Sequence, residues 1–227
     1  MRATILSLVC DCPFGKYGDD RKFSGMKLDY FFSGCLLVLL SACAGTEFSS
    51  GRQALLKGDY ESALGHFQVV AQQDPSYVYG GVLMQGIWSY VGRTQYLVGQ
   101  YPQAQKTLEQ ARGDPNNNDL ANLYLGLTLM RMGDRQKGLE DLQTGMKGIA
   151  QFINYVTEAF RFQIGQYWDP GYTLRNAIQR TLGAASGDNI DWQPLIADAE
   201  WIGMNFEQEP DRANFQQIQD LTAQGKR

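Results

Sequence analysis

Apolar residues recur with helical spacing in one stretch that later parts of the chain repeat. A Gly-Asp-Tyr turn signal at residues 58–60 leads into a segment in which Ala63, Phe67 and Val70 are three or four residues apart. This spacing places the three side chains on one face of an amphipathic helix. Pro75 ends that helix, because proline disfavours the helical conformation in the residue before it.

The same pattern returns twice, starting at Gly99 and at Gly133. The turn glycines are therefore separated by 41 and then 34 residues. In every copy another helix precedes the turn glycine. That preceding helix contains a further glycine, at which the two helices of the copy can cross closely. The repeated positions are Ala104, Leu108 and Ala111 in the second copy, Gly138, Leu142 and Gly145 in the third, and Gly51, Gly92 and Gly126 in the preceding helices.

These turn, apolar and small positions resemble the tetratricopeptide repeat, whose period is about 34 residues. Trp88, Val91 and Gly92 match the Trp, apolar and small positions of that family, and Leu125 with Gly126 matches the last two. The resemblance implies an all-α fold, a solenoid of about three antiparallel helix pairs that stack on one another. Arg135 and Gly138 replace an aromatic residue and an alanine of the family pattern, so we expect looser packing in the third pair.

Two regions depart from the repeat. The first spacing contains seven extra residues, which predict a single helix over Tyr77–Val98 that is longer than its neighbours by about two turns. After residue 147 the repeat stops, although helical periodicity continues. We therefore expect a repeat region over residues 43–147 and a C-terminal extension over 148–227 that packs on it, with helices near 149–164, 172–182, 191–206 and 211–221.

The N-terminal region predicts export and lipid attachment. An apolar run of 11 residues, 30–40, is too short to span a membrane and is typical of a signal peptide. It leads into Leu-Ser-Ala-Cys, which resembles the bacterial lipoprotein signal and implies that Cys43 is lipidated and becomes the N-terminus. The alternatives are an ordinary cleaved signal and an uncleaved anchor. Because Ala44 rather than Asp follows the cysteine, the resemblance implies the outer membrane, facing the periplasm, in a Gram-negative cell.

The residues before Met26 fit a signal peptide poorly, because they contain three aspartates. We therefore expect translation to start at Met26, with residues 1–42 as upstream sequence and signal peptide. The alternative is a long N-terminal region that uses Arg21, Lys22 and Lys27 as its positive charges.

Charge and composition narrow the function. The net charge is −4 and no basic cluster follows the N-terminal region, which argues against nucleic-acid binding. The chain has one histidine, His66, and all four cysteines lie at or before Cys43. The expected folded part therefore has no disulfide framework and no Cys/His metal site. We find no phosphate loop or nucleophile motif, so we expect no cofactor, no metal and no enzymatic activity.

The resemblance also implies which residues face the groove of the solenoid. Three arginines on one concave surface can hold the carboxylates of a partner peptide, because guanidinium matches carboxylate in a bidentate way. The alternative is that they are ordinary surface arginines. The six tentative partner-binding residues are Arg52, Arg93, Tyr96, Leu127, Met130 and Arg131.

Two other groups of side chains have both a structural and a functional interpretation. The C-terminal aromatic residues fit a core, but they also allow a closed ligand cavity near Trp168 and Trp192. The carboxylates of Glu200, Glu207, Glu209 and Asp211 have the density of a solvated helix end rather than of a catalytic pair. His66 is expected to be an exposed histidine without a chemical role.

These features predict a lipid-anchored protein of the cell envelope that acts as an adaptor or scaffold for envelope assembly or transport. Its expected partners are envelope proteins or their peptide segments, together with the membrane through Cys43. The alternative function is a small-ligand-binding accessory lipoprotein of a transport system. The repeat pattern does not select the partner.

Overall fold

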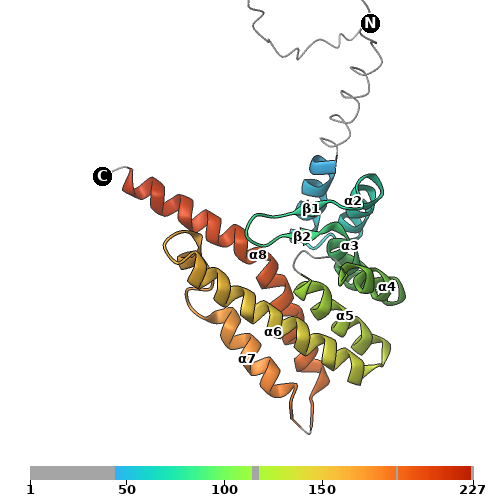
Figure 1. Ribbon diagram of the computed structural model, residues 1–227. Helices are drawn as coiled ribbons and strands as arrows, with labels where there is room; N and C mark the ends of the chain where they lie inside the picture. Colours follow the sequence, from blue (N-terminus) through green and yellow to red (C-terminus); the bar gives the residue numbers. More distant parts are fainter. Residues whose placement is uncertain (1–43, 114–117, 188, 226–227) are drawn as a thin grey trace, which may run out of the picture. The chain divides into compact units, whose positions relative to one another are not determined.

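The described part of the chain is predominantly helical (Figure 1). In this computed structural model the described residues are 44–113, 118–187 and 189–225, so Met26, Cys43 and the expected signal peptide lie outside them. The expected all-α class is confirmed. The elements are a helix over residues 44–56, α2 (Tyr60–Gln73), β1 (Val78–Tyr79), β2 (Gln85–Gly86), α3 (Ile87–Leu97), α4 (Tyr101–Ala111), α5 (Asp119–Met132), α6 (Arg135–Ala159), the 3-10 helix η1 (Ile164–Tyr167), α7 (Thr173–Ala184) and α8 (Trp192–Gln224).

Three tight turns with the same hydrogen-bond pattern connect helix 44–56 to α2, α3 to α4, and α5 to α6. Gly58, Gly99 and Gly133 have left-handed backbones, with φ of 79°, 79° and 101°. In each turn the glycine N–H donates to the carbonyl three residues earlier, and the next N–H donates to the carbonyl five residues before it. This is a Schellman motif, which favours glycine because a Cβ is strained at positive φ.

The two helices of each pair approach closely at a glycine. Gly51, Gly92 and Gly126 each lie seven residues before the turn glycine of their pair. An added Cβ would lie within 3.0 Å of a residue nine positions after the turn glycine, namely Phe67, Leu108 and Leu142, respectively. The repeated sequence offsets thus correspond to repeated helix contacts.

The third pair, α5 and α6, packs backbone against backbone. A Cβ on Gly126 would lie 2.6 Å from the Gly138 carbonyl oxygen, and one on Gly145 would lie 2.5 Å from the Leu123 nitrogen. The expectation of looser packing here is therefore wrong. Glycine lacks the Cβ that would hold the helix axes apart, so replacing the usual alanine with Gly138 brings these helices closer.

A β-hairpin replaces the first half of the long helix expected over Tyr77–Val98, and this prediction is wrong. Strand β1 pairs antiparallel with β2, with Val78 opposite Gly86, and α3 begins only at Ile87. Gly80 turns the chain with φ of 119°, and a Cβ there would lie 1.9 Å from the Leu83 carbonyl oxygen. The tyrosines and valine before it favour an extended backbone.

One 33-residue helix, α8, replaces the two helices expected near 191–206 and 211–221, so this prediction is also wrong. Pro210 lies inside α8 and removes one backbone donor. The residues around it are held in place from outside the helix: the Asp169 N–H donates to the Glu209 carboxylate at 2.5 Å, and Arg212 donates to the Tyr167 carbonyl. These contacts with the segment around η1 support the helix on both sides of the proline.

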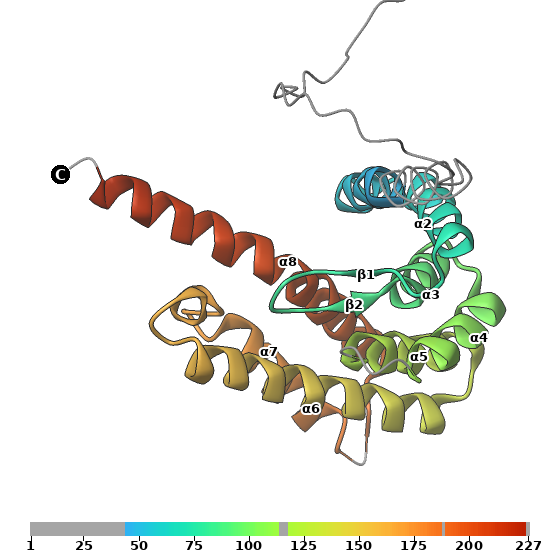
Figure 2. The same cartoon turned by 45° about the horizontal axis from the view of Figure 1, so that its top comes forward.

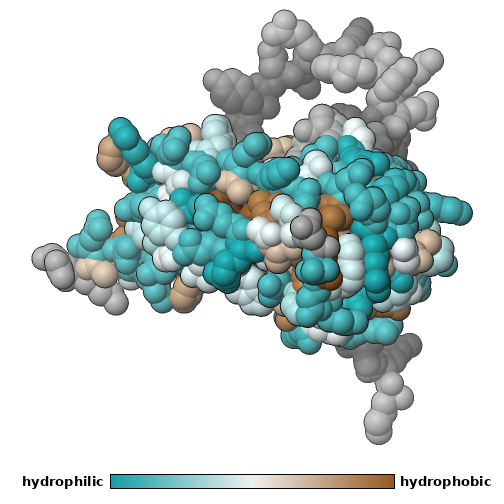
Figure 3. All heavy atoms as spheres, turned by 90° about the horizontal axis from the view of Figure 1, so that it is seen from below, coloured by the Kyte–Doolittle hydropathy of each residue, from teal (hydrophilic) through white to brown (hydrophobic). Residues whose placement is uncertain are grey.

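The inner face of α8 belongs to the main hydrophobic core. Figures 1 and 2 both show α8 crossing the α5–α6 pair, with the tip of the β-hairpin beside it. Leu195, Ile202 and Phe206 of α8 are at most 2% exposed. In the view of Figure 3 the surface is mostly hydrophilic, and hydrophobic residues gather near the middle of that face. Because its inner face is buried in the main core, α8 is an integral part of the fold.

Trp168 and Trp192, for which a ligand cavity was the alternative to the expected core, lie at opposite ends of α6. Arg135, in the first turn of α6, packs over the Trp192 ring, with 5.2 Å between the guanidinium carbon and the ring centroid. Trp168 is 1% exposed and packs on Phe152, with ring centroids 5.7 Å apart. Arg135 and Phe152 are about 26 Å apart along the helix axis at 1.5 Å per residue. One closed cavity near both tryptophans is therefore excluded.

Candidate functional site

Four of the six residues expected to face the groove point toward α8. Arg52 comes from helix 44–56, Arg93 and Tyr96 come from α3, and Arg131 comes from the last turn of α5. Arg52 and Arg93 occupy equivalent positions, six residues before their turn glycines. Leu127 occupies the third equivalent position and is fully buried, as is nearly all of Met130, so both are core residues. Their assignment to partner binding stays a prediction.

The first ionic cluster joins two arginines of the helix pairs to carboxylates of α8. The Glu207 carboxylate lies 3.4 Å from an Nη atom of Arg93 and 3.6 Å from Nε of Arg52. Arg52 also donates to the Asp211 carboxylate at 2.6 Å. The Arg93 and Glu207 side chains are 3% and 6% exposed. Such burial makes this pair costly to break, because removing either partner leaves a desolvated charge.

Tyrosine rings and carboxylates keep both arginines charged. Burial acts to lower the pKa of Arg93, but attraction to Glu207 and to the phenols of Tyr90 and Tyr124 outweighs it and raises that pKa above its usual value. The guanidinium carbon of Arg93 lies 4.6 Å from the Tyr90 ring centroid and 5.7 Å from that of Tyr124. For Arg52, burial likewise lowers the pKa, and Asp211 and Glu207 more than offset this.

The second ionic cluster contains Tyr96, Arg131 and Glu200. Arg131 donates to the Glu200 carboxylate at 2.9 Å and to the Tyr96 hydroxyl at 3.3 Å, and the Tyr96 hydroxyl donates to the same carboxylate. Burial raises the pKa of Tyr96, so its phenol stays protonated. The Arg131 and Glu200 side chains are each 33% exposed, which makes this cluster less buried than the first.

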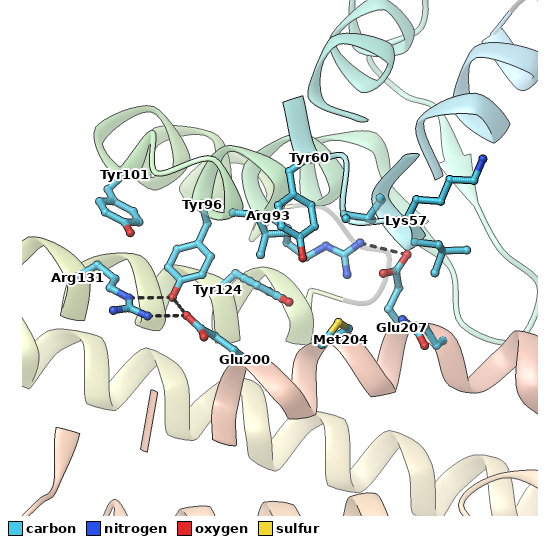
Figure 4. Close-up of a pocket in the computed structure, with 15 residues that line it drawn as sticks. Lys57, Tyr60, Arg93, Tyr96, Tyr101, Tyr124, Arg131, Glu200, Met204 and Glu207 are labelled. Atoms are coloured by element: carbon cyan, nitrogen blue, oxygen red, sulfur yellow. Dashed lines mark hydrogen bonds and ion pairs between the residues drawn. The ribbon is translucent and has the colours of Figure 1, made fainter. Parts of the chain in front are cut away.

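A pocket of about 560 Å³ lies between the two clusters. Figure 4 shows Arg131, Tyr96 and Glu200 at one end, with Arg93 pointing toward Glu207 at the other. The wall opposite α8 contains apolar and aromatic side chains. One of them, Tyr124, is buried, and this burial raises the pKa of its phenol to about 12. Besides residues of the two ionic clusters, the pocket is lined by Leu55, Leu56, Lys57, Gly58, Tyr60, Leu97, Tyr101, Tyr124, Met204 and Gln208.

Sequence reasoning missed that α8 forms one wall of this pocket. It assigned Glu207 and Glu209 to a solvated helix end, whereas each is 5% exposed, so that assignment is wrong for both. The available signal was the spacing of Glu200, Glu207 and Asp211, seven and then four residues apart, which places all three on one helix face. That face carries the charges complementary to the predicted arginines.

His66 is only partly exposed and has a partner. Its Nδ1 lies 2.7 Å from the Glu47 carboxylate, and each of the two side chains is 38% exposed. This surface contact links α2 to helix 44–56. Among the described residues, no three His, Cys, Asp or Glu side chains are arranged to hold a metal ion, and no helix has the length and hydrophobicity to cross a membrane.

In the comparisons with known proteins, no protein-family model, curated protein or solved structure matches this chain.

Proposed function

We propose that this chain is a lipid-anchored adaptor of the cell envelope, built on tetratricopeptide-like helix pairs. The repeat assignment is supported by the three equivalent glycine turns and by the equal offsets of Gly51, Gly92 and Gly126 from them. The envelope location is supported by the lipoprotein-like signal that ends at Cys43. In a Gram-negative cell the protein faces the periplasm from the outer membrane.

The anchor and the folded part are adjacent in the chain. Ala44 directly follows Cys43 and is 3% exposed, and Phe48 is fully buried. A lipid on Cys43 would therefore have no flexible spacer before the first helix. Such a short tether confines the adaptor to a thin layer beside the membrane and raises its effective concentration for partners in that layer.

The mouth of the pocket is the observation that carries the adaptor proposal. Leu56 and Met204 line it from opposite sides and are 48% and 46% exposed. Tyr60 and Tyr101 also line the pocket, and the Tyr101 ring packs on that of Tyr96, with ring centroids 5.6 Å apart. Tyrosine, methionine and arginine are enriched at protein interfaces, where a side chain of the partner fills a central pocket. A peptide segment of an envelope protein can engage this surface while α8 remains in place.

A pull-down from solubilised envelopes tests the proposal. The full chain is compared with Met204→Glu, which places a charge at the pocket mouth. A matched control is Val69→Glu on α2, since Val69 is 37% exposed and does not line the pocket. We expect wild type and the Val69 variant to recover the same protein and the Met204 variant to lose it. Equal recovery by the wild type and both variants contradicts the proposed surface.

The anchor has a separate test. Replacing Cys43 by Ser removes the thiol that would carry the lipid, so we expect the protein to move from the membrane fraction to the soluble fraction. Mass spectrometry of the wild-type N-terminus should find a lipidated Cys43. An unmodified N-terminus at another residue contradicts lipidation and leaves the pocket proposal untouched.

The pocket volume favours a second candidate function, that of a small-ligand-binding accessory lipoprotein for transport. About 560 Å³ falls within the range of small-molecule sites, roughly 300–1,000 Å³. This function predicts that native mass spectrometry finds a small molecule with the purified chain. It also predicts that Tyr60→Ala reduces its occupancy. A chain that carries no ligand and yet recovers a protein partner favours the adaptor instead.

A further inference from the structure

The outer half of α8, residues 214–224, exposes an apolar stripe along one face of the helix. Phe215, Ile218 and Leu221 are the large apolar residues of this segment, and each is at least 60% exposed. Their spacing of three residues places all of them within about a third of the helix circumference. Single exposed apolar residues are ordinary, but three on one face indicate a surface that another body covers.

The stripe faces the side of α8 on which helix 44–56 lies. Asp211 of α8 accepts a hydrogen bond from Arg52 of that helix at 2.6 Å. Phe215 and Ile218 follow Asp211 by four and seven residues, which is one and two turns along the same face. In Figures 1 and 2, helix 44–56 (blue) and the outer half of α8 (red) both lie above the α5–α6 pair. The stripe and helix 44–56 therefore share one side of the molecule.

The proposed lipid anchor is attached on the same side. Cys43 directly precedes Ala44, the first residue of helix 44–56. Ala44 lies eight residues before Arg52, which is about 12 Å along the helix axis at 1.5 Å per residue. Leu221 lies ten residues after Asp211, about 15 Å along α8. Both points are thus close enough to the contact between Arg52 and Asp211 for one bilayer surface to touch both.

The other face of the outer half is polar and nearly uncharged. Asp220 is the one charged residue of segment 214–224. It lies five residues after Phe215, so it points away from the stripe, and the Tyr167 hydroxyl donates a hydrogen bond to its carboxylate. A helix with one apolar and one polar face lies in the plane of a bilayer interface. Because the stripe contains no cation, it suits neutral lipids as well as anionic ones.

We infer that the stripe lies in the interface of the bilayer that holds the lipid of Cys43. The anchor and the stripe then make two contacts with one membrane, and two contacts limit how the folded part can tilt. The inference rests on the proposed lipid anchor and adds a second membrane contact to it. A second copy of the chain fits the stripe less well, because three side chains offer far less than the roughly 800 Å² that each partner of a stable interface buries.

A quenching measurement on the lipidated chain in vesicles of neutral phosphatidylcholine tests the inference. The same environment-sensitive fluorophore is attached to Ile218→Cys, on the stripe, or to Gln216→Cys, an exposed position on the opposite side of the helix. A phosphatidylcholine with a nitroxide near the top of its acyl chain quenches labels that enter the bilayer. We expect at least about twofold stronger quenching of the Ile218→Cys label, because an interfacial helix buries only its apolar face. High salt should leave this difference unchanged, because the stripe contains no charge.

Matched double variants locate the effect, with the label kept on Ile218→Cys. Phe215→Ser with Leu221→Ser removes the rest of the stripe and should reduce the quenching to the level found for Gln216→Cys. Gln216→Ser with Gln224→Ser changes the polar face and should leave the quenching as it was. Neither pair alters a buried residue, so both variants should fold.

Three results overturn the inference. Equal quenching of the Ile218→Cys and Gln216→Cys labels shows that the stripe does not enter the bilayer. An Ile218→Cys label whose emission shows shielding from water only at high protein density, without quenching by the lipid, shows that a second copy covers the stripe. A chain that mass spectrometry finds without lipid on Cys43 removes the anchor and the inference together. The first two results leave the anchor and the pull-down untouched, so they are distinguishable from failure of the proposed function.

Discussion

Two parts of α8, an inner half that is twice as long as the outer half, have opposite surroundings although they form one helix. The inner half, residues 192–213, contains the fully buried Phe206 and the buried Glu207. The outer half, residues 214–224, has no buried residue, and its Phe215, Ile218 and Leu221 are 60–63% exposed. Because short helices are marginal in water, the inner half is stabilised by packing, and the outer half extends a helix that is already formed. The candidate site lies beside the packed inner half, since only that half of α8 lines the pocket.

The largest expected effect comes from removing one aromatic ring in each half. Phe206→Ala should lower the free energy of unfolding by about 3–5 kcal/mol, because it leaves a cavity beside Phe152 and Trp168. Phe215→Ala, a matched change on the exposed half, should alter it by less than about 0.5 kcal/mol. Urea denaturation of both variants measures the difference. Similar losses for the two would show that the halves do not differ.

A smaller effect is expected at the second ionic cluster. Glu200→Ala removes the acceptor of Arg131 and Tyr96. The Arg131 and Glu200 side chains are each 33% exposed, so water can replace the carboxylate. The free energy of unfolding should fall by about 1 kcal/mol, within the range of solvated ion pairs that also share a hydrogen bond. Denaturant titration at low and high salt measures this, and the loss should shrink as salt rises. A loss above about 3 kcal/mol would mean that this cluster is as buried as the first.

The smallest effect is expected from shortening the outer half. A chain that ends after Ala213 loses none of the residues that are buried in the described part of the chain. Its midpoint of thermal unfolding should change by no more than a few degrees, while far-UV circular dichroism loses the signal of the missing turns. Failure of this variant to fold would show that the outer half has a stabilising role.

The helix pairs could be predicted from the sequence because their signals are local. Glycine at a fixed offset from a turn, followed by apolar residues at helical spacing, has the same meaning wherever it occurs. That is why Gly58, Gly99 and Gly133 were found, together with the close contacts at Gly51, Gly92 and Gly126. Local patterns fail when two structures share them, and the short apolar run at 77–86 fits a strand as well as a buried helix.

The candidate site could be predicted only in part, because its second wall comes from far along the chain. Arg131 and Glu200 are 69 residues apart, and Tyr96 and Glu200 are 104 apart. The spacing of Arg52 and Arg93 shows which face they share, but it does not show what covers that face. Pro210 added to the error, because proline usually marks a helix boundary and here lies within α8.

The central claim is that α8 completes the concave face through the buried contact between Arg93 and Glu207. A double-mutant cycle with Arg93→Met, Glu207→Met and the combined variant tests it most directly. Glu207→Met should cost about 3 kcal/mol or more, because it leaves the buried Arg93 without its counterion. Arg93→Met should cost less, because Arg52 still lies 3.6 Å from the Glu207 carboxylate. The combined variant should cost at least about 2 kcal/mol less than the sum of the two. Costs that add within about 0.5 kcal/mol would show that the two side chains do not interact, and would contradict the account.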